Sequence, residues 1–481
     1  MNTLEPRKEK INLLWLALLM LGNLFSGLAV FFFFSSSGFP DQPNYLALVE
    51  GLKSYGEFSS YCNEIGCLPE TLRTPGYPLF LLAVLTIFED IYLVQLIQLF
   101  LYFFCLFVAS KIILKISSNY LPLYIFLLLT IFNIQIPYYA AMISSEMLSV
   151  TFVITFFYLY LFLKDNYLKY FYTAILLAGL FYIRPAFILF PVGFLFLSSF
   201  KFTKPVFKFN LFQLICFLVF LIPFGLWNLT NHNTFKLTTM EGGAGTAHMA
   251  YWSFKLPDNY TEEFYHGASV TKDILNPFQF QYSDNKKEEY RLEYESEWRS
   301  FLENNSLNEN CFFEGRGSLL KNKTNLAVCT SEFTLLREEF LWSRVLMHFY
   351  NEPVNYLLQR AYSFLRLFYT GIRYETYASS SNIKEKVMAI YPFAVTFTSI
   401  FIGLIFSIVV LFMNRKLRVV NNFIPMIFSI LLIAASHSLF AIQSRYLVPM
   451  HLLVLISLSY SISLVIAKSE FFQNNFKIEL E

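Results

Sequence analysis

The stretch that decides the fold is residues 11–34, which reads INLLWLALLMLGNLFSGLAVFFFF and contains no charged residue. Uncharged stretches of similar length follow at 91–110, 387–413 and 419–443. A helix needs about 20 apolar residues to cross the hydrocarbon core of a bilayer, and each stretch meets that length. The sequence therefore predicts an all-α polytopic membrane protein.

The composition supports this prediction. Of the 481 residues, 56% are hydrophobic and only 15% are charged, whereas soluble domains have about 25% charged residues. The net charge of +2 gives no reason to expect a nucleic-acid partner, and we expect none. The first apolar stretch is too long for a cleaved signal peptide and lacks a small-residue cleavage site, so we interpret it as a retained first helix.

The distribution of Lys and Arg predicts the orientation, because cytoplasmic ends of spans collect these residues. Arg7, Lys8 and Lys10 precede the first span, which places the N-terminus inside and the following loop outside. Ten crossings would place all the later basic clusters inside as well. In this scheme 76–88 is a short re-entrant or partial helix, although a tilted crossing remains an alternative. Arg184-Pro185 splits 170–200 into a tight helical hairpin with Arg184 near the outer face.

Three parts follow from this topology. Residues 1–229 form an N-terminal transmembrane catalytic module that includes a first outer loop at 35–75. Residues 230–386 form a large outer loop domain of mixed structure, with an amphipathic helix at 340–373 that could lie along the membrane surface. Residues 387–481 form C-terminal transmembrane helices.

The cysteines fit an oxidising outer compartment. Cys62 and Cys67 lie in the first outer loop, and Cys311 and Cys329 lie in the second. One disulfide in each loop is the expected arrangement. Four free loop thiols are the alternative.

The first outer loop carries a carboxylate and a guanidinium near the lipid interface. Asp41 opens a helix-like run, where an Asp often serves only as an N-cap. Arg73 precedes an apolar helix and could simply anchor its end at the headgroup level. Together, however, these groups suit a phosphate-linked substrate, because Arg binds phosphate oxygens bidentately and a carboxylate can take the proton of an attacking hydroxyl.

Motifs in a fixed order extend this pattern along the chain. They are Asp41-x-x-x-Tyr45, Arg73-Thr74-Pro75-Gly76-Tyr77, Ser144-Ser145-Glu146, Arg184-Pro185 and Arg445-Tyr446-x-x-Pro449. Each motif alone is weak, but their order and spacing resemble those of the GT-C superfamily of membrane glycosyltransferases. Within it, the chain is most similar to the protein O-mannosyltransferase and lipid A aminoarabinose transferase group.

This resemblance implies a sugar donor carried on polyprenyl phosphate, held among the lipids of a bacterial-type inner or plasma membrane with the active site on the outer face. The acceptor would be a hydroxyl of a glycan, a lipid or a protein. Asp41 would be the general base of an inverting transfer. Three arginines would bind the phosphate of the donor: Arg73, Arg184 and Arg445.

Glu146 matches the second acidic position of the family, where it would orient the acceptor or bind a metal; a helix cap is the alternative. Further substrate contacts are expected from Tyr45, Tyr77, Tyr446 and His248. His248 follows a glycine cluster, so a flexible turn is the competing interpretation. The chemistry requires no cofactor, and a divalent metal is possible at Glu70 or Glu146.

Two other classes of protein fit the composition. A transporter or flippase for lipid-linked sugars would place ionisable groups near the bilayer midplane and show internal repeats. Here the candidate residues lie at the outer ends of spans and no clear repeat is visible. A polysaccharide polymerase or ligase would depend on Arg and His in outer loops. The large outer loop does not resemble the sugar-binding repeats of some protein mannosyltransferases.

Overall fold

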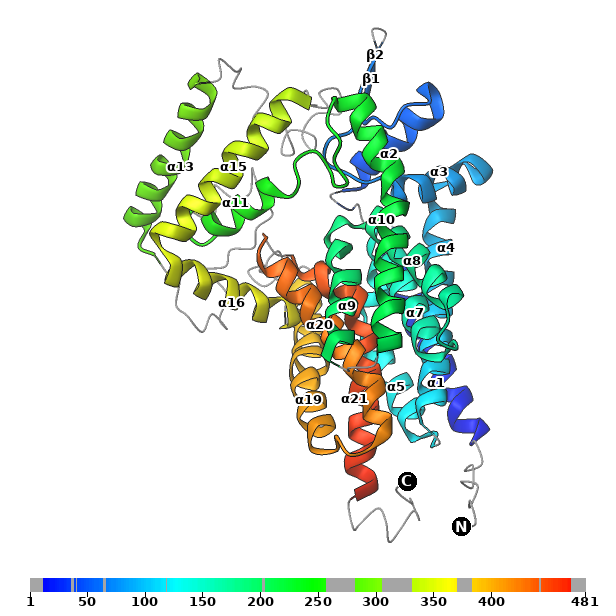
Figure 1. The fold of residues 1–481 in the computed structure, drawn as a ribbon. Coiled ribbons are helices and arrows are strands. Elements are labelled where there is room, and N and C mark those ends of the chain that lie inside the picture. Colours follow the sequence, from blue (N-terminus) through cyan, green and yellow to red (C-terminus); the bar gives the residue numbers. More distant parts are fainter. Residues whose placement is uncertain are drawn as a thin grey trace.

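The computed structural model describes residues 12–35, 39, 41–63, 66–117, 119–200, 204–256, 282–304, 331–369, 383–440 and 443–468. Within these residues the only sheet is a two-stranded antiparallel hairpin, and helices account for most of the rest. The described part of the chain is therefore essentially all-α (Figure 1).

Six helical segments are long and apolar enough to cross a membrane, which makes the chain an integral membrane protein as predicted. They are Leu13–Phe34, Ile91–Ile116, Val206–His232, Ile390–Met413, Val419–Ser438 and Arg445–Lys468. Five shorter apolar helices accompany them: Gly76–Phe88, Leu121–Phe132, Glu146–Phe162, Tyr167–Ile183 and Pro185–Ser198. The number of ten crossings stays a prediction.

The N-terminal part contains most of the helices. They are α1 (Leu13–Phe34), α2 (Gln42–Glu50), η1 (Gly51–Tyr55), α3 (Gly76–Phe88), α4 (Ile91–Ile116), α5 (Leu121–Phe132), α6 (Gln135–Ala140), α7 (Glu146–Phe162), α8 (Tyr167–Ile183), η2 (Pro185–Leu189), α9 (Phe190–Phe200) and α10 (Lys204–His232). The hairpin strands β1 (Tyr61–Asn63) and β2 (Gly66–Leu68) lie between η1 and α3.

Four helices make up the described outer domain: α11 (Ala244–Trp252), α13 (Asp284–Asn304), α15 (Ser331–Asn351) and α16 (Pro353–Tyr369). The C-terminal part consists of α18 (Ile383–Thr396), η5 (Phe397–Ile402), α19 (Gly403–Met413), η6 (Arg418–Asn422), α20 (Phe423–Ser438), η7 (Ser444–Met450) and α21 (His451–Lys468).

Helix α21 occupies the centre of the bundle. It contacts α4, α5, α7, α19 and α20, and the span that contains it is the most buried of the six candidate spans. Its serines keep that helix narrow; Ser457, for example, returns its hydroxyl to the carbonyl of Leu453 (2.9 Å). Small residues of this kind allow close helix packing in membranes.

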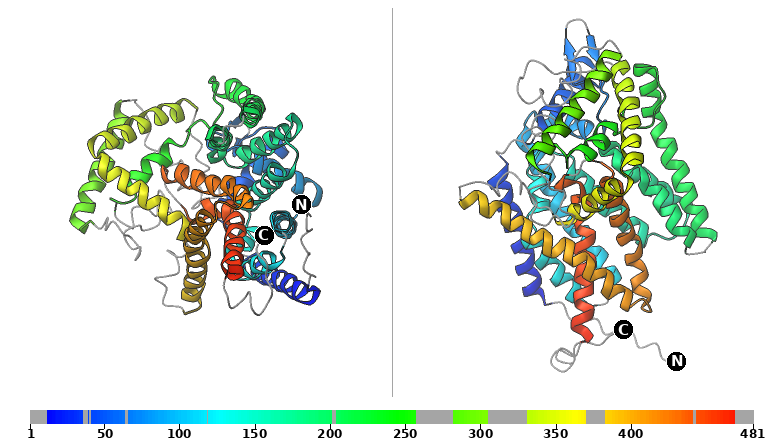
Figure 2. Two further views of the ribbon diagram at one scale, coloured as in Figure 1. Left: turned by 60° about the horizontal axis from the view of Figure 1, so that its bottom comes forward. Right: turned by 90° about the vertical axis from the view of Figure 1, so that its left-hand side faces the viewer.

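The two outer segments lie at the same end of the molecule. Figure 1 shows the β1–β2 hairpin and the helices α11, α13 and α15 at the top, and the C-terminal end of α21 at the bottom. The left view in Figure 2 shows the yellow-green outer helices beside the bundle rather than within it. That both loops face one side of the membrane stays a prediction.

The expectation of one amphipathic helix at 340–373 was wrong. The amphipathic segment 340–373 is not one helix: α15 ends at Asn351 and α16 begins at Pro353, because proline has no N–H for the helix but is favoured at its first position. Arg360 of α16 is buried and donates to the carbonyls of Ala250 and Ser438. The described part of the domain is helical; the expectation of a mixed domain stays a prediction, because 257–281, 305–330 and 370–382 lie outside the described residues.

The predicted breaks near the outer ends are correct. Helix α3 spans Gly76–Phe88, as the short apolar run indicated. Helix α8 ends at Ile183, and Arg184 is extended (φ −147°, ψ 107°), as a residue before proline must be. Pro185 therefore ends α8 and places Arg184 at the junction of α8 and η2.

Candidate active site

Five charged side chains from distant parts of the sequence meet at one place. Asp41 Oδ2 is 2.7 Å from Arg445 Nη1, and Asp41 Oδ1 is 3.7 Å from Arg73 Nη2. Glu146 Oε1 is 3.3 Å from Arg184 Nη1 and 3.5 Å from Arg445 Nε. Arg445 thus bridges both carboxylates, and three guanidinium groups against two carboxylates leave one positive charge in excess.

Asp41 is not an N-cap, although it stands in that position before α2. Its side chain makes no capping hydrogen bond, and Pro43 follows within the first turn of α2. A proline there removes one of the N–H groups that a cap would serve. The Asp41 carboxylate points instead to Arg445 and Arg73.

Glu146 begins α7, where the helix dipole favours a carboxylate. Only 1% of its side chain is exposed, against 26% of the Asp41 side chain. Asp41 is therefore the carboxylate that a substrate can reach. Glu146 makes no side-chain cap of its helix and instead holds the guanidinium groups of Arg184 and Arg445.

Aromatic rings flank the arginines. The Arg73 guanidinium lies 5.6 Å from the ring centre of Tyr45, and Arg184 and Arg445 lie 5.2 and 5.9 Å from that of Tyr446. Such cation–π contacts fix the orientation of a guanidinium. Burial, and then the charge of Asp41, raise the pKa of Tyr45, so its hydroxyl stays protonated.

Tyr77 stands one layer behind this cluster. Its ring packs edge-on against Tyr45 at 4.7 Å, and its hydroxyl donates to Gln98 Oε1 at 2.9 Å. Tyr77 is fully buried, so it supports Tyr45 rather than facing the charged groups. On the other side, Phe39 lies 5.0 Å from the Arg445 guanidinium.

Glu70 closes the turn that leads to Arg73. Its Oε1 accepts hydrogen bonds from the backbone N–H groups of Leu72 (2.9 Å) and Arg73 (3.0 Å), and its Oε2 accepts one from Ser60 (3.1 Å). A divalent metal at Glu70 or Glu146 stays a prediction. Glu70 is engaged by donors, and Glu146 lies between two guanidinium groups.

The predicted first-loop disulfide is present. Cys62 and Cys67 face each other across the β1–β2 hairpin and are bonded. The second predicted pair, Cys311 and Cys329, lies outside the described residues. The hairpin is tied to the turn at Glu70, because the N–H of Glu70 donates to the carbonyl of Phe58 (3.0 Å) and Ser60 Oγ donates to Glu70 Oε2 (3.1 Å).

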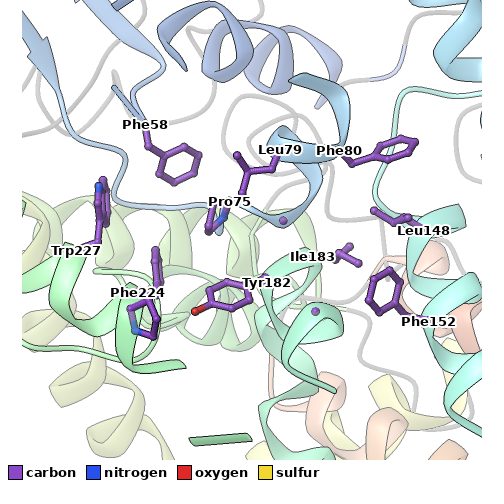
Figure 3. Close-up of a pocket in the computed structure, with 13 residues that line it drawn as sticks. Phe58, Pro75, Leu79, Phe80, Leu148, Phe152, Tyr182, Ile183, Phe224 and Trp227 are labelled. Atoms are coloured by element: carbon purple, nitrogen blue, oxygen red, sulfur yellow. The ribbon is translucent and has the colours of Figure 1, made fainter. Parts of the chain in front are cut away.

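An apolar pocket of about 560 Å³ lies between helices that begin or end near some of the charged residues (Figure 3). Its lining comes from α3, α7, α8 and α10, together with Phe58, and includes Pro75, Gly76, Leu79, Phe80, Leu148, Phe152, Tyr182, Ile183, Phe224 and Trp227. Three charged residues lie within two positions of this lining along the chain. Arg184 follows Ile183, Arg73 lies two residues before Pro75, and Glu146 lies two residues before Leu148.

His248, which was expected to contact the substrate, does not lie in the charged cluster. It lies in the outer domain on α11, beside Glu297 of α13 and His348 of α15. Sequence reasoning missed Glu297 and His348, because no local spacing connects residues on three separate helices. It also missed the contact of Phe39 with Arg445 and the hydrogen bonds by which Glu70 holds the turn before Arg73. Both depend on side-chain directions that no local sequence pattern contains.

Comparison of the chain with protein-family models, with curated proteins and with solved structures finds no match to any of them.

Proposed function

We propose that the chain is a membrane glycosyltransferase that moves a sugar from a polyprenyl-phosphate donor to an acceptor hydroxyl, with inversion at the anomeric carbon. One observation supports the proposal: an apolar pocket is lined by residues within one or two positions of Arg73, Glu146 and Arg184, which belong to a cluster with an excess positive charge. This pairing suits a ligand that joins an anionic phosphate to a long hydrocarbon. Apolar pockets with a few convergent polar groups are the usual form of ligand sites.

The arginines would hold the phosphate. Arg73 and Arg445 have 17% of their side chains exposed, so phosphate oxygens can approach them from the loop side. As the sugar–phosphate bond breaks, the polyprenyl phosphate departs with the electron pair of that bond. Guanidinium groups already in place stabilise this developing charge, which lowers the barrier to the reaction.

Asp41 would act as the general base. Its carboxylate is the exposed one of the pair, and it takes the proton of the acceptor hydroxyl while the hydroxyl oxygen attacks the anomeric carbon. Attack opposite the leaving phosphate inverts the configuration. Glu146, almost fully buried, would set the directions of Arg184 and Arg445 rather than touch the acceptor.

The position of the cluster favours a transferase over a transporter. Asp41, Arg73, Glu146, Arg184 and Arg445 all lie at helix ends or in the loops beside them. A transporter would concentrate such groups near the bilayer midplane. We place the reaction at the outer face of a bacterial-type inner or plasma membrane, on the side of the first loop and its disulfide. The acceptor is a hydroxyl of a glycan, a lipid or a protein.

The test compares the purified wild-type protein with Asp41→Asn and with Glu50→Gln, which removes an exposed carboxylate from the same helix, α2. Each protein receives radiolabelled polyprenyl-phosphate sugars and a membrane extract as the source of acceptor. We expect Asp41→Asn to retain donor binding and to lose transfer by about 100-fold or more, while Glu50→Gln behaves as wild type. Equal transfer by Asp41→Asn would remove Asp41 as the base. Donor binding without any transfer by the wild type would favour a transporter.

A further inference from the structure

Three ionisable side chains converge in the interior of the outer domain, and none of them takes part in the proposed transfer. They are His248 on α11, Glu297 on α13 and His348 on α15. The two carboxylate oxygens of Glu297 face one imidazole each: Oε2 is 3.3 Å from His248 Nε2, and Oε1 is 3.3 Å from His348 Nε2. All three residues are buried.

The spacing fits a metal ion. The potential ligand atoms of the three residues all lie within 4.8 Å of one another. Around a tetrahedral ion with bonds of 2.0–2.1 Å, neighbouring ligand atoms are about 3.3 Å apart. Both contacts of Glu297 have that separation. Two imidazoles and one carboxylate with an open fourth position are a familiar ligand set for Zn²⁺.

The hydrogen bonds around His248 leave a place for a cation. The indole Nε1 of Trp252 is 3.1 Å from His248 Nε2, and an indole nitrogen can only donate. Nε2 is then unprotonated, so it meets the Glu297 oxygen as a second acceptor. Two acceptors 3.3 Å apart repel each other unless a cation lies near both.

His348 supplies an independent observation. Its Nε2 is buried and has no hydrogen bond of acceptable geometry, although it points to Glu297 Oε1. The ring is held by Tyr251, which stacks on it at 4.0 Å between centroids with an angle of 11°. A buried nitrogen without a hydrogen bond lowers the stability of the fold unless another partner, such as a metal ion, takes its lone pair. Arg344 Nη1, 4.0 Å from Glu297 Oε1, is the only opposing charge in contact among the described residues.

We propose that His248, Glu297 and His348 bind a divalent transition-metal ion of the Zn²⁺ class, with water in the fourth position. The lone pair of His248 Nε2 would turn from the Trp252 indole to the ion. The ion would join α11, α13 and α15, three helices that are distant in the sequence, and so stabilise the outer domain. This inference does not depend on the proposed transferase activity.

The experiment uses the full chain in detergent, free of any polyhistidine tag. After metal removal the protein receives Zn²⁺ or Co²⁺. Bound metal is counted by mass spectrometry, and the visible spectrum of bound Co²⁺ reports the coordination. Glu297→Gln and His348→Gln remove ligands, and Glu295→Gln is the control on the same helix, where Glu295 pairs with Arg291 instead.

We expect about one Zn²⁺ per chain, an intense Co²⁺ spectrum of four-coordinate type and a higher unfolding temperature with zinc. Glu297→Gln and His348→Gln should bind about 100-fold more weakly or worse, and Glu295→Gln should bind normally. Zinc binding by the wild type no tighter than that of Glu297→Gln would overturn the proposal. If the variants fail to fold, a weak six-coordinate Co²⁺ spectrum of the wild type, or no bound metal, overturns it by itself.

Discussion

Asp41 and Arg445 lie near opposite ends of the chain, yet their side chains form the shortest ion pair of the candidate site, with Oδ2 and Nη1 2.7 Å apart. The same guanidinium reaches Glu146 Oε1 through its Nε at 3.5 Å. Arg445 therefore neutralises two carboxylates that would otherwise repel each other in a largely buried place. A donor phosphate that approached Arg445 would have to share it with both of them.

Replacement of Arg445 should separate the role of its charge from that of its shape. Arg445→Ala leaves Asp41 and Glu146 without their shared partner, so we expect a loss of about 3–5 kcal/mol in stability and no transfer. Arg445→Lys keeps the charge but not the planar fork, so it should fold and transfer about 10–100-fold more slowly. Unfolding temperatures and initial rates measure both effects. Arg415→Lys, at an exposed position after α19, is the control. A wild-type rate for Arg445→Lys would contradict bidentate binding.

Glu70 offers a test between a turn cap and a metal ligand. Because Oε1 accepts from the N–H groups of Leu72 and Arg73, Glu70→Gln keeps the acceptor while Glu70→Ala removes it. We expect Glu70→Gln to transfer within about threefold of wild type, and Glu70→Ala to raise the KM for donor by about 10-fold through a misplaced Arg73. Steady-state kinetics with a purified donor measure this. An equal, metal-dependent loss in both variants would instead support a ligand role.

The sequence predicts the membrane part of the fold well, because an uncharged run of sufficient length has few alternatives to a spanning helix. The bounds of α3 follow from Pro75 before it and from Glu89 and Asp90 after it. The break between α15 and α16 was missed because the apolar pattern continues across Pro353, and proline there starts a helix rather than merely ending one.

The candidate site could be predicted only in part. Asp41, Arg73, Glu146, Arg184 and Arg445 were each expected at an outer end of a span, and a common membrane face brings such ends together. Which group pairs with which depends on side-chain directions that no local pattern contains. The bridge from Arg445 to both carboxylates is of this kind, and so is the meeting of Glu297 with two histidines.

Gly76 should matter because two backbones approach closely there. A Cβ atom at Gly76 would lie 2.5 Å from the carbonyl of Tyr182, at the end of α8 that carries Arg184. Gly76→Ala must push α3 away from α8, so we expect a loss of about 1–3 kcal/mol in stability and slower transfer, because Arg73 and Arg184 separate. Gly22→Ala is the control, since its Cβ would meet only the flexible tip of Ile131. Thermal unfolding and transfer rates unchanged in Gly76→Ala would contradict this packing argument.

The apolar pocket predicts a dependence of the wild type on the length of the donor lipid. Each buried methylene contributes about 0.8 kcal/mol, so a donor with a long isoprenoid chain should have a lower KM than a short-chain donor with the same sugar and phosphate. Leu79 lines the pocket and is 48% exposed, so Leu79→Trp can fill the pocket without disturbing the core. We expect Leu79→Trp to raise the KM for the long donor about 10-fold and to leave the short donor unchanged.

Ile87→Trp adds the same bulk to the same helix at a position that does not line the pocket, and it should match the wild type. The comparison separates the pocket from the charged cluster, because a loss of phosphate binding would affect long and short donors equally. If the wild type used both donors with one KM, the pocket would not be the site of the lipid chain. If Leu79→Trp and Ile87→Trp slowed transfer from both donors alike, the cause would be a general disturbance of α3. That result would contradict a role of the pocket in binding the lipid chain.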